Sequence, residues 1–170
     1  MKILEINMFD KIAGGVERYI STLGHEIVRN GHELSHVYIT RQDGPSELIG
    51  GINAYYLPEL SMYGCRELIS GRFSKSVRNG LDRLGDIVRT ERPDVIHVHN
   101  VYYPIFVGML RRFCPVVRTI HDYRFLCPNL MKLQVKNGKI CNTNLGIECF
   151  RAGCISHKNL MDYRQLMFIL

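Results

Sequence analysis

The sequence predicts a doubly wound α/β fold, in which helices cover both faces of a parallel sheet. Between Lys2 and His121, short apolar segments of strand length alternate with longer segments whose apolar residues recur at helical spacing. The links between successive strands are long enough for the crossovers that parallel strands require. A chain of 170 residues, 46% apolar and 22% charged, fits one compact domain and excludes a disordered one.

Five segments are expected to be strands. The first is a short apolar run, the second alternates between polar and apolar residues, and the third is rich in tyrosine and stops before Pro58. The fourth and fifth are short runs rich in valine and isoleucine, each of which ends in a histidine. The predicted strands are residues 2–8, 33–40, 52–57, 94–99 and 115–121.

Helices are expected between these strands. Val16 opens an apolar stripe that closes at Asn30-Gly31, a typical C-terminal stop signal. A second stripe, over residues 77–88, ends at Arg92-Pro93 because the residue before a proline is pushed out of the α region. A proline also fits the first turn of a third helix, over residues 104–113.

The segment from residue 122 to residue 157 is expected to be an irregular, Cys-rich insertion within the single domain 1–170. It has no clear periodicity and is longer than most loops of compact domains, and an apolar helix is expected after it, over residues 158–170. Four thiolates can bind a structural zinc ion, which would order such a segment. The spacing contains no CxxC pair, so buried thiols without a metal are the alternative. The cysteines concerned are Cys127, Cys141, Cys149 and Cys154.

Charge and hydropathy bound the partners and the location. The net charge of +6 favours anionic partners such as phosphates without choosing among them. The first residues do not form a signal peptide, and no apolar run approaches the roughly 20 residues of a membrane span, so a cytoplasmic protein is expected. Residues 57–73 mix apolar and basic side chains, as a segment at the inner face of a membrane does and as a helix packed on the domain also does.

Ligands of an open parallel sheet bind at the carboxyl ends of its strands. Gly14-Gly15 follows the first strand, where a helix N-terminus favours an anion, although two glycines can also simply turn the chain. His99 and Asn100 follow the fourth strand, and a histidine there is either a binding residue or a hydrogen-bonded rim residue. His121, beside Asp122, can bind hydroxyls and phosphates or transfer a proton near neutral pH.

Four motifs follow one another along the chain. They are Gly14-Gly15-Val16-Glu17, Asn30-Gly31-His32-Glu33, Pro93 to His99, and Thr119 to Asp122. In this order and spacing, they resemble one known pattern. The pattern is that of the N-terminal, Rossmann-like domain of a GT-B glycosyltransferase of the group 1, or family 4, type. The resemblance covers residues 1 to about 128, and the cysteines that follow are similar to those of bacterial enzymes that build surface polysaccharides.

The resemblance implies a hexosyltransferase that retains the anomeric configuration and needs no cofactor for the transfer. A sugar would pass from a nucleotide-sugar donor to a glycan or lipid-linked acceptor, with no nucleic acid involved. By motif position, Gly14 and Gly15 would contact the donor diphosphate and His121 would be catalytic. The residues implied to bind the acceptor are His99, Asn100, Asp122, Tyr123 and Arg124.

The donor-binding C-terminal domain of that family has no counterpart in these 170 residues, so no turnover is expected from this chain alone. The main alternative is a non-catalytic Rossmann-like module that binds a phosphate-rich partner with an affinity that falls steeply with salt. A third reading is a redox or sensor protein that binds a metal through its cysteines.

Overall fold

The computed structural model describes residues 1–12, 14–39, 52–60, 73–101, 104–123, 126–127, 131–134, 136–144 and 146–154. These residues belong to two compact units, of which the first reaches to Thr119 and the second begins at Ile120. The predicted C-terminal helix over residues 158–170 and most of the segment 57–73 lie outside the described residues. No helix in the described part of the chain is long and apolar enough to cross a membrane.

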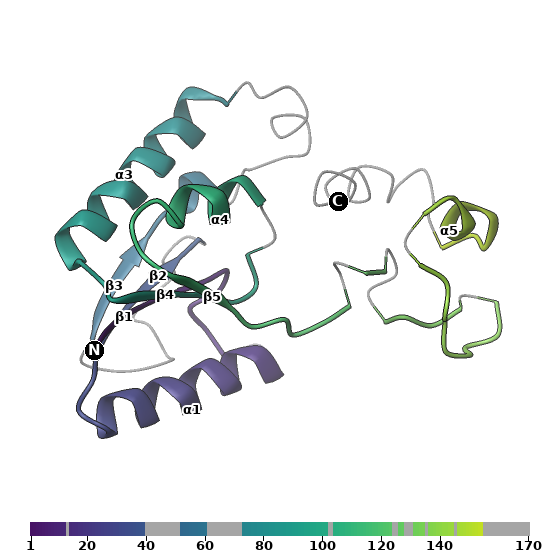
Figure 1. Ribbon diagram of the computed structural model, residues 1–170, viewed down its shortest axis with the longest axis horizontal. Helices are drawn as coiled ribbons and strands as arrows, with labels where there is room; N and C mark the ends of the chain where they lie inside the picture. Colours follow the sequence, from purple (N-terminus) through teal and green to yellow (C-terminus); the bar gives the residue numbers. More distant parts are fainter. Residues whose placement is uncertain are drawn as a thin grey trace. The chain divides into compact units, whose positions relative to one another are not determined.

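The first unit contains one five-stranded sheet whose strands are all parallel, which confirms the predicted fold class (Figure 1). The strand order is β3-β2-β1-β4-β5, so the direction of winding reverses between β1 and β4. The strands are β1 (Lys2–Asn7), β2 (Glu33–Tyr38), β3 (Asn53–Tyr56), β4 (Val95–Val98) and β5 (Val116–Arg118).

Helices cover both faces of this sheet. Figure 1 shows α1 (Gly15–Arg29) on one face, and α3 (Lys75–Glu91) and α4 (Pro104–Leu110) on the other. Because side chains alternate along a strand, each strand supplies apolar residues to both layers. One core cluster on the α1 side consists of Ile3, Ile20, Leu34 and Tyr38.

The ends of the two long helices follow the predicted stop signals. Gly31 has a φ of +76°, and the amides of Gly31 and His32 donate to the carbonyls of Val28 and Ile27, as in a Schellman motif. Arg92 closes α3 in the left-handed region, with a φ of 48°, which agrees with the exclusion of the residue before Pro93 from the α region.

A 3-10 turn, η1 (Pro58–Leu60), packs directly against α3. A Cβ atom at Gly80 of α3 would lie 2.9 Å from Leu60 Cδ2 and 3.1 Å from Glu59 Cβ, so this contact requires glycine. Beside it, Arg83 donates a hydrogen bond to the carboxylate of Glu59 at 2.5 Å. The sequence analysis did not predict this turn.

Two elements end three residues earlier than predicted. The helix expected over residues 104–113 stops at Leu110, because the amides of Arg112 and Phe113 donate three residues back and tighten the last turn. The strand expected over residues 115–121 stops at Arg118, and the amide of Thr119 makes one more hydrogen bond, to the carbonyl of Val98.

The second unit contains more regular structure than the predicted irregular insertion. Leu133 and Ile140 form an antiparallel bridge, and Gly138, with a φ of +67°, lies in the turn between them. A short helix, α5 (Ile147–Arg151), follows. The sequence analysis missed both elements, because a single bridge and a five-residue helix are too short to produce a visible period.

Candidate functional site at the carboxyl edge of the sheet

The carboxyl ends of β1 and β4 lie side by side, as the predicted site requires. Ile6 is the register partner of Val98, and the amide of His99 donates to the carbonyl of Ile6 at 3.0 Å. The ring of Tyr19, on the second turn of α1, meets the ring of His99 edge-on, with 6.1 Å between the centroids. The first turns of α1 and the end of β4 therefore border one region.

The Gly14-Gly15 turn is exposed and leaves room for a ligand. Gly14 is extended, neither glycine has a positive φ, and a Cβ atom at Gly15 would have no neighbour within 4 Å. Turning the chain therefore does not require glycine at these positions. Glu17 is buried in the first helical turn, and its Oε2 atom lies 3.5 Å from the place that a Cβ atom would take at Gly14. Because this carboxylate repels negative charge, an anion at the helix start would have to lie on the Gly15 side.

Two buried acceptor atoms border the same edge. Asn7 and Asp10 are 1% and 4% exposed, and neither Asn7 Oδ1 nor Asp10 Oδ2 has a hydrogen-bond partner among the described residues. Such acceptors can receive hydrogen bonds from ligand hydroxyls. The sequence analysis did not select these residues. Their only signal was that polar residues end a buried strand and occupy the loop after it.

The remaining predicted residues divide between the two units. Asn100, half-buried, follows His99 in the first unit, whereas His121 and Asp122, both half-buried, and the exposed Tyr123 belong to the second. Arg124 lies outside the described residues. The structure thus brings His99 next to Tyr19 of α1. The roles assigned to the predicted site residues stay predictions.

A buried polar cluster lies next to this edge, in the centre of the sheet. Glu5, on the central strand β1, pairs in register with His36 of β2 and with His97 of β4, so the three side chains share one face. Glu5 Oε2 lies 2.9 Å from His36 Nε2. Glu5 Oε1 lies 3.5 Å from both His97 Nδ1 and His99 Nε2.

This cluster sets the charge states of its members. Burial raises the pKa of Glu5, but the three histidines lower it by more than burial raises it. The pKa therefore lies well below its ordinary value. Burial is also the main reason why the pKa of His99 lies below its ordinary value. At neutral pH the cluster therefore contains an ionised carboxylate and a neutral His99. Glu5 was hidden from the sequence analysis within an apolar run.

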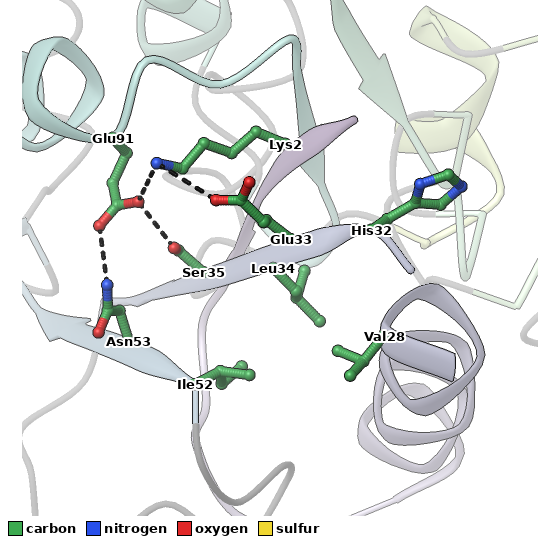
Figure 2. Close-up of a pocket in the computed structure, with 9 residues that line it drawn as sticks. All are labelled: Lys2, Val28, His32, Glu33, Leu34, Ser35, Ile52, Asn53 and Glu91. Atoms are coloured by element: carbon green, nitrogen blue, oxygen red, sulfur yellow. Dashed lines mark hydrogen bonds and ion pairs between the residues drawn. The ribbon is translucent and has the colours of Figure 1, made fainter. Parts of the chain in front are cut away.

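The cavity drawn in Figure 2 lies at the opposite, amino edge of the sheet and has a volume of about 300 Å³. Its polar wall is centred on Glu91, which accepts hydrogen bonds from Ser35 at 2.9 Å and from Asn53 at 3.3 Å and lies 3.5 Å from Lys2 Nζ. Tyr55 also donates to Glu91, and this bond raises the pKa of Tyr55 to about 12. These contacts anchor the end of α3 to the sheet, so we assign the cavity a structural role.

The four cysteines predicted as metal ligands are all buried. Cys149 lies in α5, and the amide of Cys154 donates to its carbonyl at 3.0 Å. Over the described ranges, one ligand atom each from Glu5, His97 and His99 comes within 4.8 Å of the others, whereas the cysteines form no such group. A zinc site at the cysteines stays a prediction.

The domain is doubly wound, and a helix N-terminus, buried acceptors and histidines lie at its switch point. It therefore belongs to the class of ligand-binding modules that place substrates at the carboxyl edge of a sheet. A family model, Glycosyltransferase Family 4, matches residues 13–138, and the chain belongs to this family. The predicted family is thereby confirmed, and the chain is a module of a glycosyltransferase-type enzyme, whose substrates in general are a sugar donor and an acceptor. No curated protein matches the chain significantly.

Proposed function

We propose that this chain is the acceptor-binding, N-terminal half of a retaining GT-B glycosyltransferase. The complete enzyme transfers a hexosyl group from a nucleotide-sugar to a glycan or lipid-linked acceptor, in the synthesis of a bacterial surface polysaccharide at the inner face of the membrane. Gly14 and Gly15 approach the donor phosphates, and His121 acts at the reaction centre. His99, Asn100, Asp122, Tyr123 and Arg124 line the acceptor side.

The observation that carries this proposal is the family match over residues 13–138, which includes the Gly14-Gly15 turn, the end of β4 and His121. Three features of the carboxyl edge support it. The space over Gly15 is open, the first amides of α1 point out of the helix start, and two buried acceptors lie nearby. Backbone donors suit a phosphate, and carboxylate and amide oxygens suit sugar hydroxyls.

The test is a transfer assay on the complete protein encoded by the reading frame that contains this chain. Nucleotide release is followed with a panel of nucleotide-sugars and with lipid-linked or glycan acceptors, and NMR of the product reports the anomeric configuration. We expect His121→Ala to lower kcat by roughly 10²–10⁴-fold, the usual contribution of a proton-transferring side chain. His25→Ala removes an exposed histidine whose ring contacts the carbonyl of Ser21, and it serves as the matched control.

Full activity of His121→Ala would remove the catalytic role of this residue, and an inverted product would remove the retaining mechanism. If no sugar is transferred while the protein binds polyphosphate with an affinity that falls steeply with salt, the alternative of a non-catalytic phosphate-binding module replaces the proposal.

Zinc binding by Cys127, Cys141, Cys149 and Cys154 is a separate proposal. All four side chains are buried in a unit whose described residues form one short helix and one bridge, a setting in which a metal adds order. The test is the zinc content of the purified protein, with replacement of the four cysteines by serine as the comparison. Equal zinc content in both proteins would reject this site.

A further inference from the structure

A second region of the sheet, under α1, contains charged chemistry that sugar transfer does not explain. Glu5 is 1% exposed and lies on the central strand, with imidazole rings on both neighbouring strands. A carboxylate in such a place is costly unless hydrogen bonds or a cation compensate it.

Among the described residues, the contacts between the Glu5 carboxylate and the histidines are not well-aligned hydrogen bonds. Neither carboxylate oxygen of Glu5 receives a hydrogen bond of acceptable geometry, although three imidazole nitrogens lie within 3.5 Å. The nitrogens are thus close to the carboxylate without aligned N–H donors. A cation bound beside the carboxylate oxygen would compensate its buried charge.

The distances match a metal centre. Two ligand atoms that each lie about 2.0–2.1 Å from a tetrahedral ion are roughly 3.3–3.4 Å apart. Glu5 Oε1 is 3.5 Å from His97 Nδ1 and 3.5 Å from His99 Nε2, and one ligand atom from each residue lies within 4.8 Å of the others. Only small side-chain shifts are needed to close these ligands around an ion.

The surrounding contacts are those of an outer shell. Metal-bound histidines commonly use the second ring nitrogen for a hydrogen bond, and metal-bound carboxylates are themselves contacted by other side chains. His97 Nε2 lies 2.7 Å from Thr119 Oγ1, and the second carboxylate oxygen of Glu5 lies 2.9 Å from His36 Nε2. His36 Nδ1 is in turn 2.5 Å from the hydroxyl of Tyr38.

We propose that Glu5, His97 and His99 bind a divalent transition-metal ion, for which Zn²⁺ is the best match. Two imidazoles and one carboxylate suit Zn²⁺ and its neighbours better than Mg²⁺ or Ca²⁺, which prefer all-oxygen ligand sets. The ion joins β1 to β4 at the switch point of the sheet and holds the end of β4 under α1. The proposal shares His99 with the acceptor side proposed above, but its test does not depend on sugar transfer.

The side chain of His97 is 13% exposed, against 1% for Glu5, and so marks the side from which an ion enters.

The experiment uses untagged protein that has been stripped with a chelator and then titrated with Co²⁺ and with Zn²⁺. Calorimetry gives the stoichiometry and the affinity, and the visible spectrum of Co²⁺ distinguishes nitrogen and oxygen ligands from thiolates. We expect a stoichiometric site without thiolate charge-transfer bands. This site should persist when Cys127, Cys141, Cys149 and Cys154 are replaced by serine.

Variants locate the site. We expect Glu5→Gln and His97→Gln to weaken Co²⁺ binding more than 100-fold, and Thr119→Val to weaken it about 10- to 100-fold through the outer shell. His32→Gln, at the opposite edge of the sheet, is the matched control and keeps full affinity. Circular dichroism confirms that each variant is folded, and Thr119→Val carries the test if Glu5→Gln does not fold.

Three results would overturn the proposal: no binding of either ion at millimolar concentration, binding that disappears only with the cysteines, or unchanged affinity in a folded His97→Gln or Thr119→Val variant.

Discussion

Two glycines of α3 should respond in opposite directions to the same substitution. At Gly80, an added Cβ would lie 2.9 Å from Leu60 Cδ2, 3.0 Å from Leu60 Cγ and 3.1 Å from Glu59 Cβ, well inside the roughly 3.5–4.0 Å optimum for carbon pairs. Leu60 is 1% exposed, so other atoms surround its side chain. At Gly85, the nearest atom would be the end of the flexible Arg89 side chain, at 3.4 Å.

The magnitudes follow from two terms. Alanine in place of glycine within a helix gains about 1 kcal/mol, and overpacking a tight contact costs about 1–3 kcal/mol. We therefore expect Gly80→Ala to lower the free energy of unfolding by up to about 2 kcal/mol, and Gly85→Ala to raise it by about 0.5–1 kcal/mol.

Urea unfolding followed by circular dichroism measures both values, and Tm should move in the same directions, by roughly 2–4 °C per kcal/mol for a chain of this size. Because both variants carry the same chemical change in the same helix, each is the control for the other. Equal stabilisation by both would show that η1 does not pack on α3 as described, and destabilisation by both would refute the helix-propensity term.

Three further predictions concern other parts of the first unit. In chelator-treated protein, the free energy of unfolding should decrease as the pH falls below about 6.5, because His99 takes up a proton only on unfolding, and again below about 4.5, because Glu5 does the same. Both decreases follow from folded pKa values that lie below the ordinary ones. Urea midpoints between pH 7 and pH 3 test this, and Glu5→Gln should flatten the second decrease. Tyr55→Phe should lower the free energy of unfolding by about 1–2 kcal/mol, because the hydrogen bond to Glu91 is lost. Urea unfolding measures this change, and a decrease below about 0.3 kcal/mol would contradict that contact. Gly31→Ala should lower the free energy of unfolding by about 1–2 kcal/mol, because Gly31 has a φ of +76° that alanine disfavours. An unchanged Tm would argue against the left-handed cap.

The order of the elements was predictable because each rests on local signals. Gly31 and Pro93 mark helix ends through backbone sterics alone, and the short apolar runs have the length of buried strands. The family was also predictable, since its motifs are contiguous stretches of sequence.

The polar cluster could not be predicted in the same way. Glu5, His36 and His97 come together only through the register of β1 with β2 and with β4, and nothing local in the sequence specifies that register. The buried acceptor of Asp10 was hidden for a related reason, because an aspartate in a loop is ordinarily solvated.

The position of β1 has a consequence for how the chain folds. Of the five strands of the sheet, the central one is synthesised before the other four, and one of its partners, at Asp94, follows 92 residues after Lys2. The half-sheet of β3, β2 and β1 can form on the ribosome, but one edge of β1 remains open until β4 emerges. During that interval Glu5 has its partner from β2 and lacks those from β4. Translation speed between β3 and β4 therefore sets how long the most polar part of the core stays exposed, and a ribosome-stalling experiment across this stretch would reveal that interval as a period of protease sensitivity.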